Sequence, residues 1–174
     1  MVKNNNRKIK YMVEASMIAS LYIIFTYISA AMGLAYGNFQ LRLSEVLTIL
    51  PIFTPAAIPG LTIGCFFSNL SSPFGFIDWV FGSLSTFLCS VLTRKLRNIK
   101  INDIPILAPI PPIIANALVV SMLLILSVDT QISWKVFLPL AFSVSAGEAV
   151  MCFLGLGLSV IMKKSGIASR IFDD

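Results

Sequence analysis

Residues 135–164 read KVFLPLAFSVSAGEAVMCFLGLGLSVIMKK, an apolar run that ends on two lysines and holds one carboxylate, Glu148, near its middle. A helix of ~20 residues crosses the ~30 Å hydrocarbon core of a bilayer. This stretch is therefore long enough to span a membrane, with Lys163 and Lys164 at the level of the headgroups. A carboxylate in mid-membrane is costly unless it is paired or faces water. The stretch predicts both a membrane protein and a buried polar site.

The remainder of the chain has the same character. Of the 174 residues, 57% are hydrophobic and only 12% are charged, and the mean hydropathy is +0.89. A soluble domain needs far more polar surface than this to cover its core. We expect an all-α integral membrane protein, with residues 1–174 forming a single transmembrane domain of about six helices. The expected helices cover about 11–32, 41–53, 56–70, 78–96, 105–127 and 135–162.

The basic residues predict how this bundle lies in the membrane. Eleven of the thirteen Lys and Arg residues fall in the N-terminal segment 1–10, the loop 94–104 and the tail 163–174; the other two are Arg42 and Lys135. Positive charge gathers on the cytoplasmic side of bacterial-type inner-membrane proteins. We therefore predict a multi-pass protein of the bacterial plasma membrane with both termini in the cytoplasm. The expected outer loops are 33–40 and 128–134.

Several classes of function are disfavoured by what the sequence lacks. No histidine occurs, which removes the commonest proton shuttle and metal ligand. Neither G-x-x-x-x-G-K-[ST] nor G-x-G-x-x-G is present, so energy must come from a gradient or a partner. We expect no enzyme activity, no cofactor, no metal and, despite the net charge of +5, no nucleic acid partner. The three cysteines, Cys65, Cys89 and Cys152, are interpreted as small buried residues.

Small residues recur every four positions on three of the expected helices, a spacing that lets helix backbones approach closely in lipid. On the third and sixth helices we interpret these stripes as packing surfaces within the chain. Ala15 and Ala19 on the first helix form a similar pair, which serves either such packing or the docking of a partner. The two stripes are Gly60, Gly64 and Ser68, and Gly147, Met151, Gly155 and Ser159.

Polar side chains within the apolar segments are the candidate site residues. Glu148 is the strongest, because an ionisable group inside the membrane is by default functional. Asn116 lies in the middle of an otherwise apolar segment and is either part of a site or a hydrogen-bond link between helices. Both side chains are expected to face the interior of the bundle.

Four further polar residues lie toward the expected outer half, each with a structural alternative. Arg42 and Glu45 are three residues apart on one helix face and either form a surface ion pair or belong to the site. Asn69 and Asp78 lie at helix ends, where such residues also serve as caps. Glu14, near the cytoplasmic end, is expected to pair with the basic N-terminal segment.

Aromatic residues near these groups complete the candidate site. Either some of them stack on a flat ring, or, for Trp79 and Trp134, they belong to the interfacial aromatic belt. These aromatic residues are Tyr36, Phe39, Phe76, Trp79 and Trp134. The three acids Glu45, Asp78 and Glu148 against one arginine give the site a formal charge near −2. Such a site favours a ligand that is cationic or rich in hydrogen-bond donors.

The stretch NFQLRLSEVLTILPIFTPAAIPGLTIGCFFSNLSSPFGFIDWVFGS, residues 38–83, together with PPIIANALVV at 111–120 and SAGEAV at 145–150, resembles the QueT-type family of queuosine-precursor transporters. These are substrate-binding S-components of energy-coupling factor (ECF) transporters. The resemblance covers most of the chain and is most specific over 39–83. It implies a six-helix protein that captures its ligand outside, then docks on a membrane coupling subunit carrying two cytoplasmic ATPases.

The resemblance also implies a ligand and a docking surface. The ligand would be queuine or another 7-deazaguanine, whose N1–H and 2-amino group can both bond to one carboxylate. We expect Glu148 or Asp78 to read that edge, the other acid to take a remaining donor, and Asn69 and Asn116 to serve the acceptors. Phe39 or Trp79 would stack, and Arg42 and Glu45 would hold the first loop over the site as a lid. In S-components an A-x-x-x-A face contacts the coupling subunit, a role that falls here on Ala15 and Ala19.

Two alternatives stay open at this point. The chain could be an S-component for another flat heterocycle, such as riboflavin, thiamin or a pterin. It could instead be a stand-alone secondary transporter driven by protons, with Glu148 as the relay, although no internal repeat is evident. Copurification of an ATPase would distinguish the second alternative from an S-component.

Overall fold

A computed structural model describes residues 2–36, 39–127 and 133–172. The helices and turns of this part of the chain include no strand, only an isolated β-bridge between Ile101 and Ile104, so its regular structure is helical as expected. Most of the predicted loop 128–134 and small parts of the predicted segments 33–40 and 163–174 lie outside the described residues. The elements are α1 (Val2–Ala31), the 3₁₀ helix η1 (Leu43–Ile52), α2 (Ala57–Asn69), α3 (Phe76–Leu96), α4 (Ile110–Ser127), α5 (Trp134–Lys164) and α6 (Ile167–Ile171).

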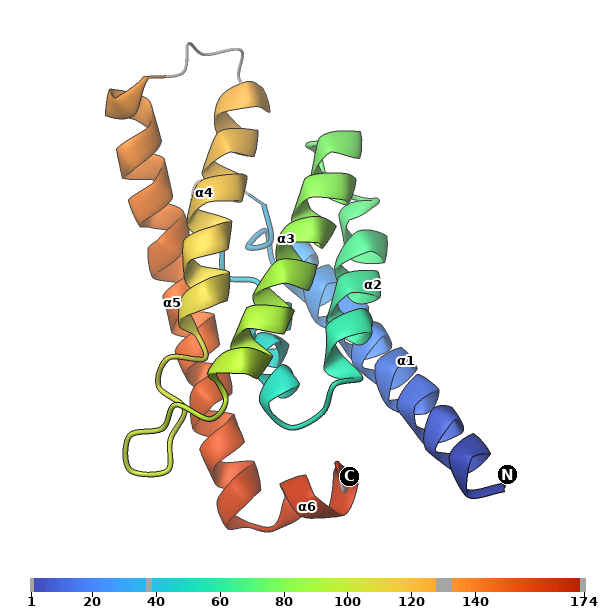
Figure 1. Ribbon diagram of the computed structural model, residues 1–174. Coiled ribbons are helices and arrows are strands. Elements are labelled where there is room, and N and C mark those ends of the chain that lie inside the picture. The colour runs from blue at the N-terminus through green and yellow to red at the C-terminus, as the bar shows by residue number, and fades with distance from the viewer. Residues whose placement is uncertain (1, 37–38, 128–132, 173–174) are drawn as a thin grey trace.

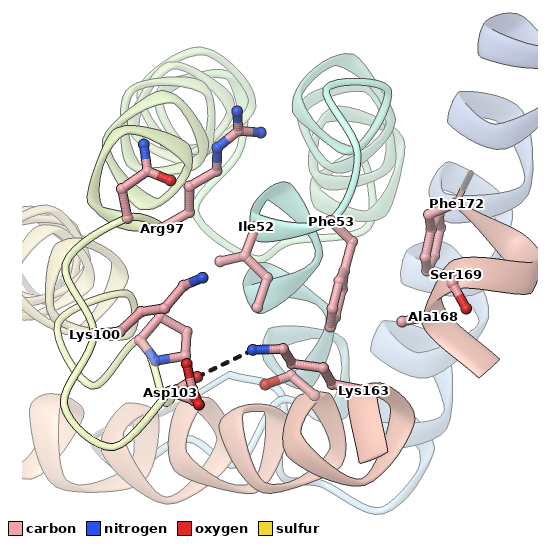
Figure 2. Close-up of a pocket in the computed structure, with 12 residues that line it drawn as sticks. Ile52, Phe53, Arg97, Lys100, Asp103, Lys163, Ala168, Ser169 and Phe172 are labelled. Carbon is pink, nitrogen blue, oxygen red and sulfur yellow. Dashed lines mark hydrogen bonds between the residues drawn. The ribbon is translucent and has the colours of Figure 1, made fainter. Parts of the chain in front are cut away.

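The helices form two groups with η1 between them (Figure 1). On one side α1 packs against α2 and α2 against α3, and on the other α4 packs against α5. The helix η1 contacts α1, α2, α3 and α5, which places it in the interior. Both ends of the chain and the connection from α3 to α4 lie at one end of the bundle, here named the termini end. The short helix α6 turns away from α5 there and lines a pocket (Figure 2).

Three described helices are long and apolar enough to cross a membrane, namely Asn5–Ala31, Phe76–Leu96 and Trp134–Lys164. The apolar segments Leu43–Ile52 and Ile110–Leu126 are shorter, and α2 has only 13 residues. A 13-residue α-helix is ~20 Å long, less than the hydrocarbon thickness. The helical class of the prediction is thus confirmed for the described residues, and three membrane-length helices are present where we expected about six.

Two helix assignments differ from the sequence prediction. The first helix begins at Val2 rather than near Tyr11, so residues 2–10 of the basic N-terminal segment belong to α1. Lys10 contributes to this by pairing with Glu14 at 3.8 Å, one helical turn on, as expected for Glu14. Glu14 also accepts a hydrogen bond of 2.7 Å from Thr54 Oγ1, which ties α1 to the segment after η1.

The second predicted α-helix is a 3₁₀ helix, and the reason lies in its surroundings. A Cβ built on Gly147 of α5 would lie 2.0 Å from the backbone oxygen of Gln40, and one on Gly155 would lie 2.4 Å from that of Val46. The chain from Gln40 to Val46 therefore lies directly against the backbone of α5. A 3₁₀ helix is narrower than an α-helix and aligns residues three apart, so Glu45 and Thr48 project along one line.

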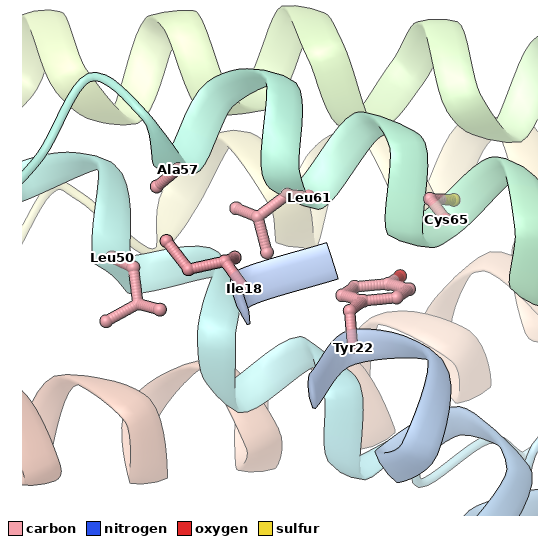
Figure 3. Close-up of a cluster of buried hydrophobic side chains, with 6 residues drawn as sticks. All are labelled: Ile18, Tyr22, Leu50, Ala57, Leu61 and Cys65. Carbon is pink, nitrogen blue, oxygen red and sulfur yellow. The ribbon is translucent and has the colours of Figure 1, made fainter. Parts of the chain in front are cut away.

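The small-residue stripes pack within the chain, as predicted. A Cβ on Gly60 would approach the backbone oxygen of Ala15 to 2.8 Å, and one on Gly64 would approach that of Ala19 to 3.0 Å. These contacts bring α1 and α2 together, and side chains from both helices and from η1 form a cluster that is fully or almost fully buried (Figure 3). The cluster comprises Ile18, Tyr22, Leu50, Ala57, Leu61 and Cys65.

Candidate substrate-binding site

Arg42 is buried in the interior at the start of η1, with 8% of its surface exposed. Its Nη2 atom donates a hydrogen bond of 2.7 Å to Asn69 Oδ1, at the end of α2. The guanidinium carbon lies 5.5 Å from the centre of the Tyr36 ring, within the range of a cation–π contact. Arg42 therefore links the segment that precedes η1 to the end of α2.

Asp78 continues this network into α3. Asn69 Nδ2 donates to Asp78 Oδ1 at 3.2 Å, and Ser72 Oγ donates to Asp78 Oδ2 at 2.5 Å. Gly82 leaves room for the network, because a Cβ there would lie 2.6 Å from Asn69 Nδ2 and 2.7 Å from Asp78 Oδ1. Both carboxylate oxygens of Asp78 thus have protein partners. The capping alternative is wrong for Asp78, since the N-cap position of α3 is Gly75.

A small internal cavity lies beside this network, where η1 and α3 meet α4. Glu45 and Thr48 project into it from η1, and Asn116 projects into it from α4. Its volume is about 10 Å³, room for roughly one water molecule. Its other lining residues are Thr86, Cys89, Ser90, Thr93 and Pro112.

Glu148 of α5 is buried, with 7% of its surface exposed, and is not among the residues that line this cavity. Cys152, one turn further along α5, donates from Sγ to Glu148 Oε1 at 3.3 Å, and Thr48 Oγ1 lies 3.6 Å from the same sulfur. Asn116 also interacts with the Glu148 carboxyl, and the carboxylate of Glu45 repels it. Two acids and an amide predicted from different segments of the sequence are therefore neighbours in space.

Tyr22 is the partner of Glu45, and sequence reasoning missed it. Its hydroxyl donates to Glu45 Oε1 at 2.6 Å, and its side chain is fully buried between α1 and η1 (Figure 3). The surface ion pair considered for Arg42 and Glu45 is wrong: both are buried, and in the described structure they lie beyond ion-pair distance of each other. A tyrosine within an apolar helix gives no sequence signal of a hydrogen bond 23 residues away. Sequence reasoning also missed Thr48, Ser72 and Cys152, because nothing in the sequence indicates their hydrogen-bond partners.

Replacing Tyr22 with phenylalanine is expected to destabilise the folded protein by about 1–3 kcal/mol, because the buried Glu45 carboxylate then loses a donor. Tyr27→Phe is the matched control on the same helix, since the Tyr27 side chain is 46% exposed. Thermal unfolding in detergent measures both. Equal unfolding temperatures for the two variants would show that the Tyr22–Glu45 hydrogen bond adds nothing to stability.

The remaining predicted site residues differ in where they lie. Phe39 is 50% exposed and has no described contact with Glu45 or Glu148. Trp79 follows Asp78 on α3, and its buried Nε1–H has no hydrogen-bond partner within the described chain. Ala15 and Ala19 lie on the side of α1 that faces α2, so packing within the chain accounts for their small size. Their docking role stays a prediction.

The cavity is too small for a bicyclic heterocycle, so this conformation is closed. Thr93 Oγ1 donates to the Ala108 oxygen at 3.0 Å, and Cys89 Sγ to that of Pro111 at 3.4 Å, which hold α3 against the start of α4. Away from the cavity, the chain at Gln40 lies directly against Gly147 of α5. Because η1, α3 and α4 line the cavity, it can widen only if α3 and α4 separate or η1 moves.

Membrane-length apolar helices around an enclosed set of charged and amide side chains define an integral membrane protein with an interior polar site. The chain belongs to the QueT transporter family, whose sequence profile matches residues 12–164. The prediction from the quoted motifs is thereby confirmed, and the family is one of transporters.

One relative is the queuosine precursor transporter QueT of Lactococcus lactis subsp. cremoris (strain MG1363). It is 37% identical to this chain over 76 residues, a match that covers 44% of the chain and 44% of the relative. The match thus spans less than half of the relative's length. No solved structure gives a significant match.

Proposed function

We propose that this protein binds a queuosine precursor of the 7-deazaguanine class and acts as the substrate-binding S-component of an ECF-type importer. The observation that carries the proposal is an interior cluster of Glu45, Asn116 and Glu148 in a member of the QueT transporter family: Glu45 and Asn116 line one small cavity, and Glu148 interacts with both of them. The name of the Lactococcus relative supports the same substrate class.

The donors of a 7-deazaguanine match the acids of this cluster, Glu45 and Glu148. N1–H and the 2-amino group form two parallel donors, and a carboxylate can accept both in charge-assisted hydrogen bonds. Glu148 is the proposed acceptor, because both oxygens of Asp78 already have protein partners. Asn116 would donate its amide to O6. Glu45 would then receive an aminomethyl ammonium, which replaces its expected role in a lid.

The Asp78 network has a positioning role in this proposal. Through Asn69 it fixes Arg42, and Arg42 precedes η1, the helix that carries Glu45. The buried Nε1–H of Trp79, one residue from Asp78, is a further donor for a ligand acceptor once the cavity opens.

The proposed topology has six membrane segments, with η1 and α2 crossing as short helices shielded by their neighbours. Irregular or short helices are tolerated at membrane depth where protein buries them, and η1 contacts four other helices. The segments carrying eleven of the thirteen Lys and Arg residues run to the termini end, which is the proposed cytoplasmic side of a bacterial plasma membrane. A coupling subunit with two ATPases would supply the energy, since the chain contains no nucleotide-binding motif.

Calorimetric titration of the detergent-purified chain tests the substrate class. The ligands are queuine, its aminomethyl and cyano precursors, guanine, riboflavin and thiamin. We expect binding of the deazaguanines, tightest for the aminomethyl form because the site carries a formal charge near −2, and no heat from the vitamins. A vitamin signal without any deazaguanine signal from folded protein would overturn the substrate assignment.

Uptake of a labelled deazaguanine by a host that lacks its own carrier tests the S-component role. We expect uptake only when the coupling subunit and both ATPases are co-expressed, and loss of uptake when the ATPases carry inactive Walker motifs. Uptake by the chain alone that stops on addition of a protonophore would identify a proton-coupled carrier instead.

A further inference from the structure

The pocket at the termini end is separate from the polar cavity and larger. It has a volume of about 360 Å³ and lies between the ends of η1, α3 and α5 and the short helix α6 (Figure 2). Three cations and one carboxylate line it, Arg97, Lys100 and Lys163 with Asp103. The formal charge of the lining is therefore near +2, opposite in sign to that of the substrate cavity.

The pocket also has an apolar side. Phe53, after η1, and Phe172, after α6, stack with ring centres 5.7 Å apart and their planes within 4° of parallel. Ile52 and Ala168 lie near them in the lining (Figure 2). A site that pairs cationic groups with an apolar wall is complementary to an amphiphile with an anionic head.

The cations that line the pocket come from different parts of the chain. Lys163 Nζ donates to the Asp103 backbone oxygen at 3.4 Å, which brings α5 to the loop that follows α3. That loop is a tight turn in which Ile101 and Ile104 exchange backbone hydrogen bonds of 3.0 and 3.1 Å. Asn102 and Asp103, with φ of 51° and 64°, form its left-handed corner, a conformation that Asn and Asp tolerate better than most residues.

The depth of the pocket points to a membrane lipid. Trp134 begins α5 and Lys163 lies 29 residues along it, a distance of ~44 Å for an α-helix. This is about the thickness of a bilayer with its headgroups. With Trp134 at one interface, Lys163 and the pocket lie at the level of the opposite headgroups. Basic pockets between helices at this level are suited to anionic lipid headgroups.

We propose that this pocket binds the phosphate headgroup of an anionic phospholipid, with Lys100 and Lys163 on the phosphate and the Phe53–Phe172 wall along the glycerol and upper acyl chain. Arg97 supplies a third cation from α3. A bound lipid would join the ends of α3, α5 and α6 at one headgroup. The site is independent of which substrate the protein carries.

Titration of the detergent-purified full chain with dioleoylphosphatidylglycerol, followed by native mass spectrometry and thermal unfolding, tests the proposal. Loss of each lysine is expected to weaken binding roughly fivefold, so the Lys100→Gln/Lys163→Gln double variant should bind about 30-fold more weakly than the wild type. Lys95→Gln/Lys164→Gln is the matched control, because it removes two exposed lysines from the same end that do not line the pocket. We expect it to bind within about twofold of the wild type.

Two further measurements keep the result interpretable. Ser169→Trp fills the pocket without changing its charge and should also weaken binding of phosphatidylglycerol. This variant tests the pocket even if the lysine double variant misfolds. Dioleoylphosphatidylcholine and inorganic phosphate should each produce no stabilisation. Equal weakening in both lysine double variants, equal binding of phosphatidylcholine, or equal stabilisation by free phosphate would each overturn the proposal.

Discussion

Substitution of Gly147 by alanine is expected to destabilise the folded protein by about 3 kcal/mol. The new Cβ would lie 2.0 Å from the backbone oxygen of Gln40, and a backbone atom cannot rotate away as a side chain can. The segment before η1 must therefore leave α5. Gly155→Ala, where the Cβ would lie 2.4 Å from the Val46 oxygen, is expected to follow with a smaller loss.

Gly157 provides the matched control on the same helix. A Cβ on Gly157 would meet nothing within 4 Å, and alanine favours a helix over glycine by up to ~1 kcal/mol. Gly157→Ala should therefore unfold at the same temperature as the wild type or slightly higher. Thermal unfolding in one detergent gives the order Gly147→Ala, Gly155→Ala, Gly157→Ala from least to most stable. An unaltered unfolding temperature for Gly147→Ala would mean that the chain does not pass over α5 at this point.

The effect of Gly147→Ala should extend to ligand binding. Gln40 is two residues before Arg42 and five before Glu45, so displacement of this segment moves both side chains away from their partners. Stability and binding are thus linked through one backbone contact.

The helical class and the buried acids could be predicted because they depend on composition and local pattern. A long apolar run must hydrogen-bond its own backbone in lipid, and a carboxylate inside it must face the bundle interior. Glu148 satisfied both conditions, and Asn116, an amide within another apolar run, is its neighbour in the structure. The glycine stripes were predictable for the same reason, since spacing alone places them on one helix face.

The choice of partners could not be predicted in this way. Arg42 and Glu45 are three residues apart and of opposite charge, yet Arg42 bonds to Asn69 and Glu45 to Tyr22. Those partners come from α2 and α1, and only the packing of the helices decides which of the available groups is nearest. Local spacing makes an ion pair possible, but the fold offers each group a different buried neighbour.

The conformation of η1 was likewise beyond the sequence pattern. Hydrophobic residues in LSEVLTILPI are compatible with either an α-helix or a 3₁₀ helix, because residues three apart share a face in both. The difference arises from the contact with α5. There Gly147 and Gly155 leave room for the backbone of a narrow 3₁₀ helix but not for a wider α-helix. The narrower helix is the consequence of a close approach between segments about a hundred residues apart.

Glu148→Gln is expected to weaken binding of the aminomethyl deazaguanine on the order of 100-fold, because two charge-assisted hydrogen bonds become one neutral acceptor and a repelled donor. The substitution preserves size, and the Cys152 thiol can still donate to the amide oxygen, so folding should be retained. Asp78→Asn tests the alternative assignment. Its oxygens are occupied by Asn69 and Ser72, so we expect lower thermal stability and a smaller loss of affinity, roughly tenfold or less.

Asp103→Asn is the control for charge alone, since Asp103 is an exposed carboxylate at the termini end. Calorimetry on the three variants separates the roles: Glu148→Gln should lose affinity at normal stability, Asp78→Asn should lose stability first, and Asp103→Asn should change neither. Comparing the aminomethyl and cyano ligands gives a second test. Because Glu148→Gln removes a negative charge, it should weaken binding of the cationic aminomethyl ligand more than binding of the neutral cyano ligand. If Glu148→Gln binds both ligands as the wild type does while Asp78→Asn binds neither, the guanine-like edge is read by Asp78, and the closed arrangement around Asp78 must open when the ligand enters.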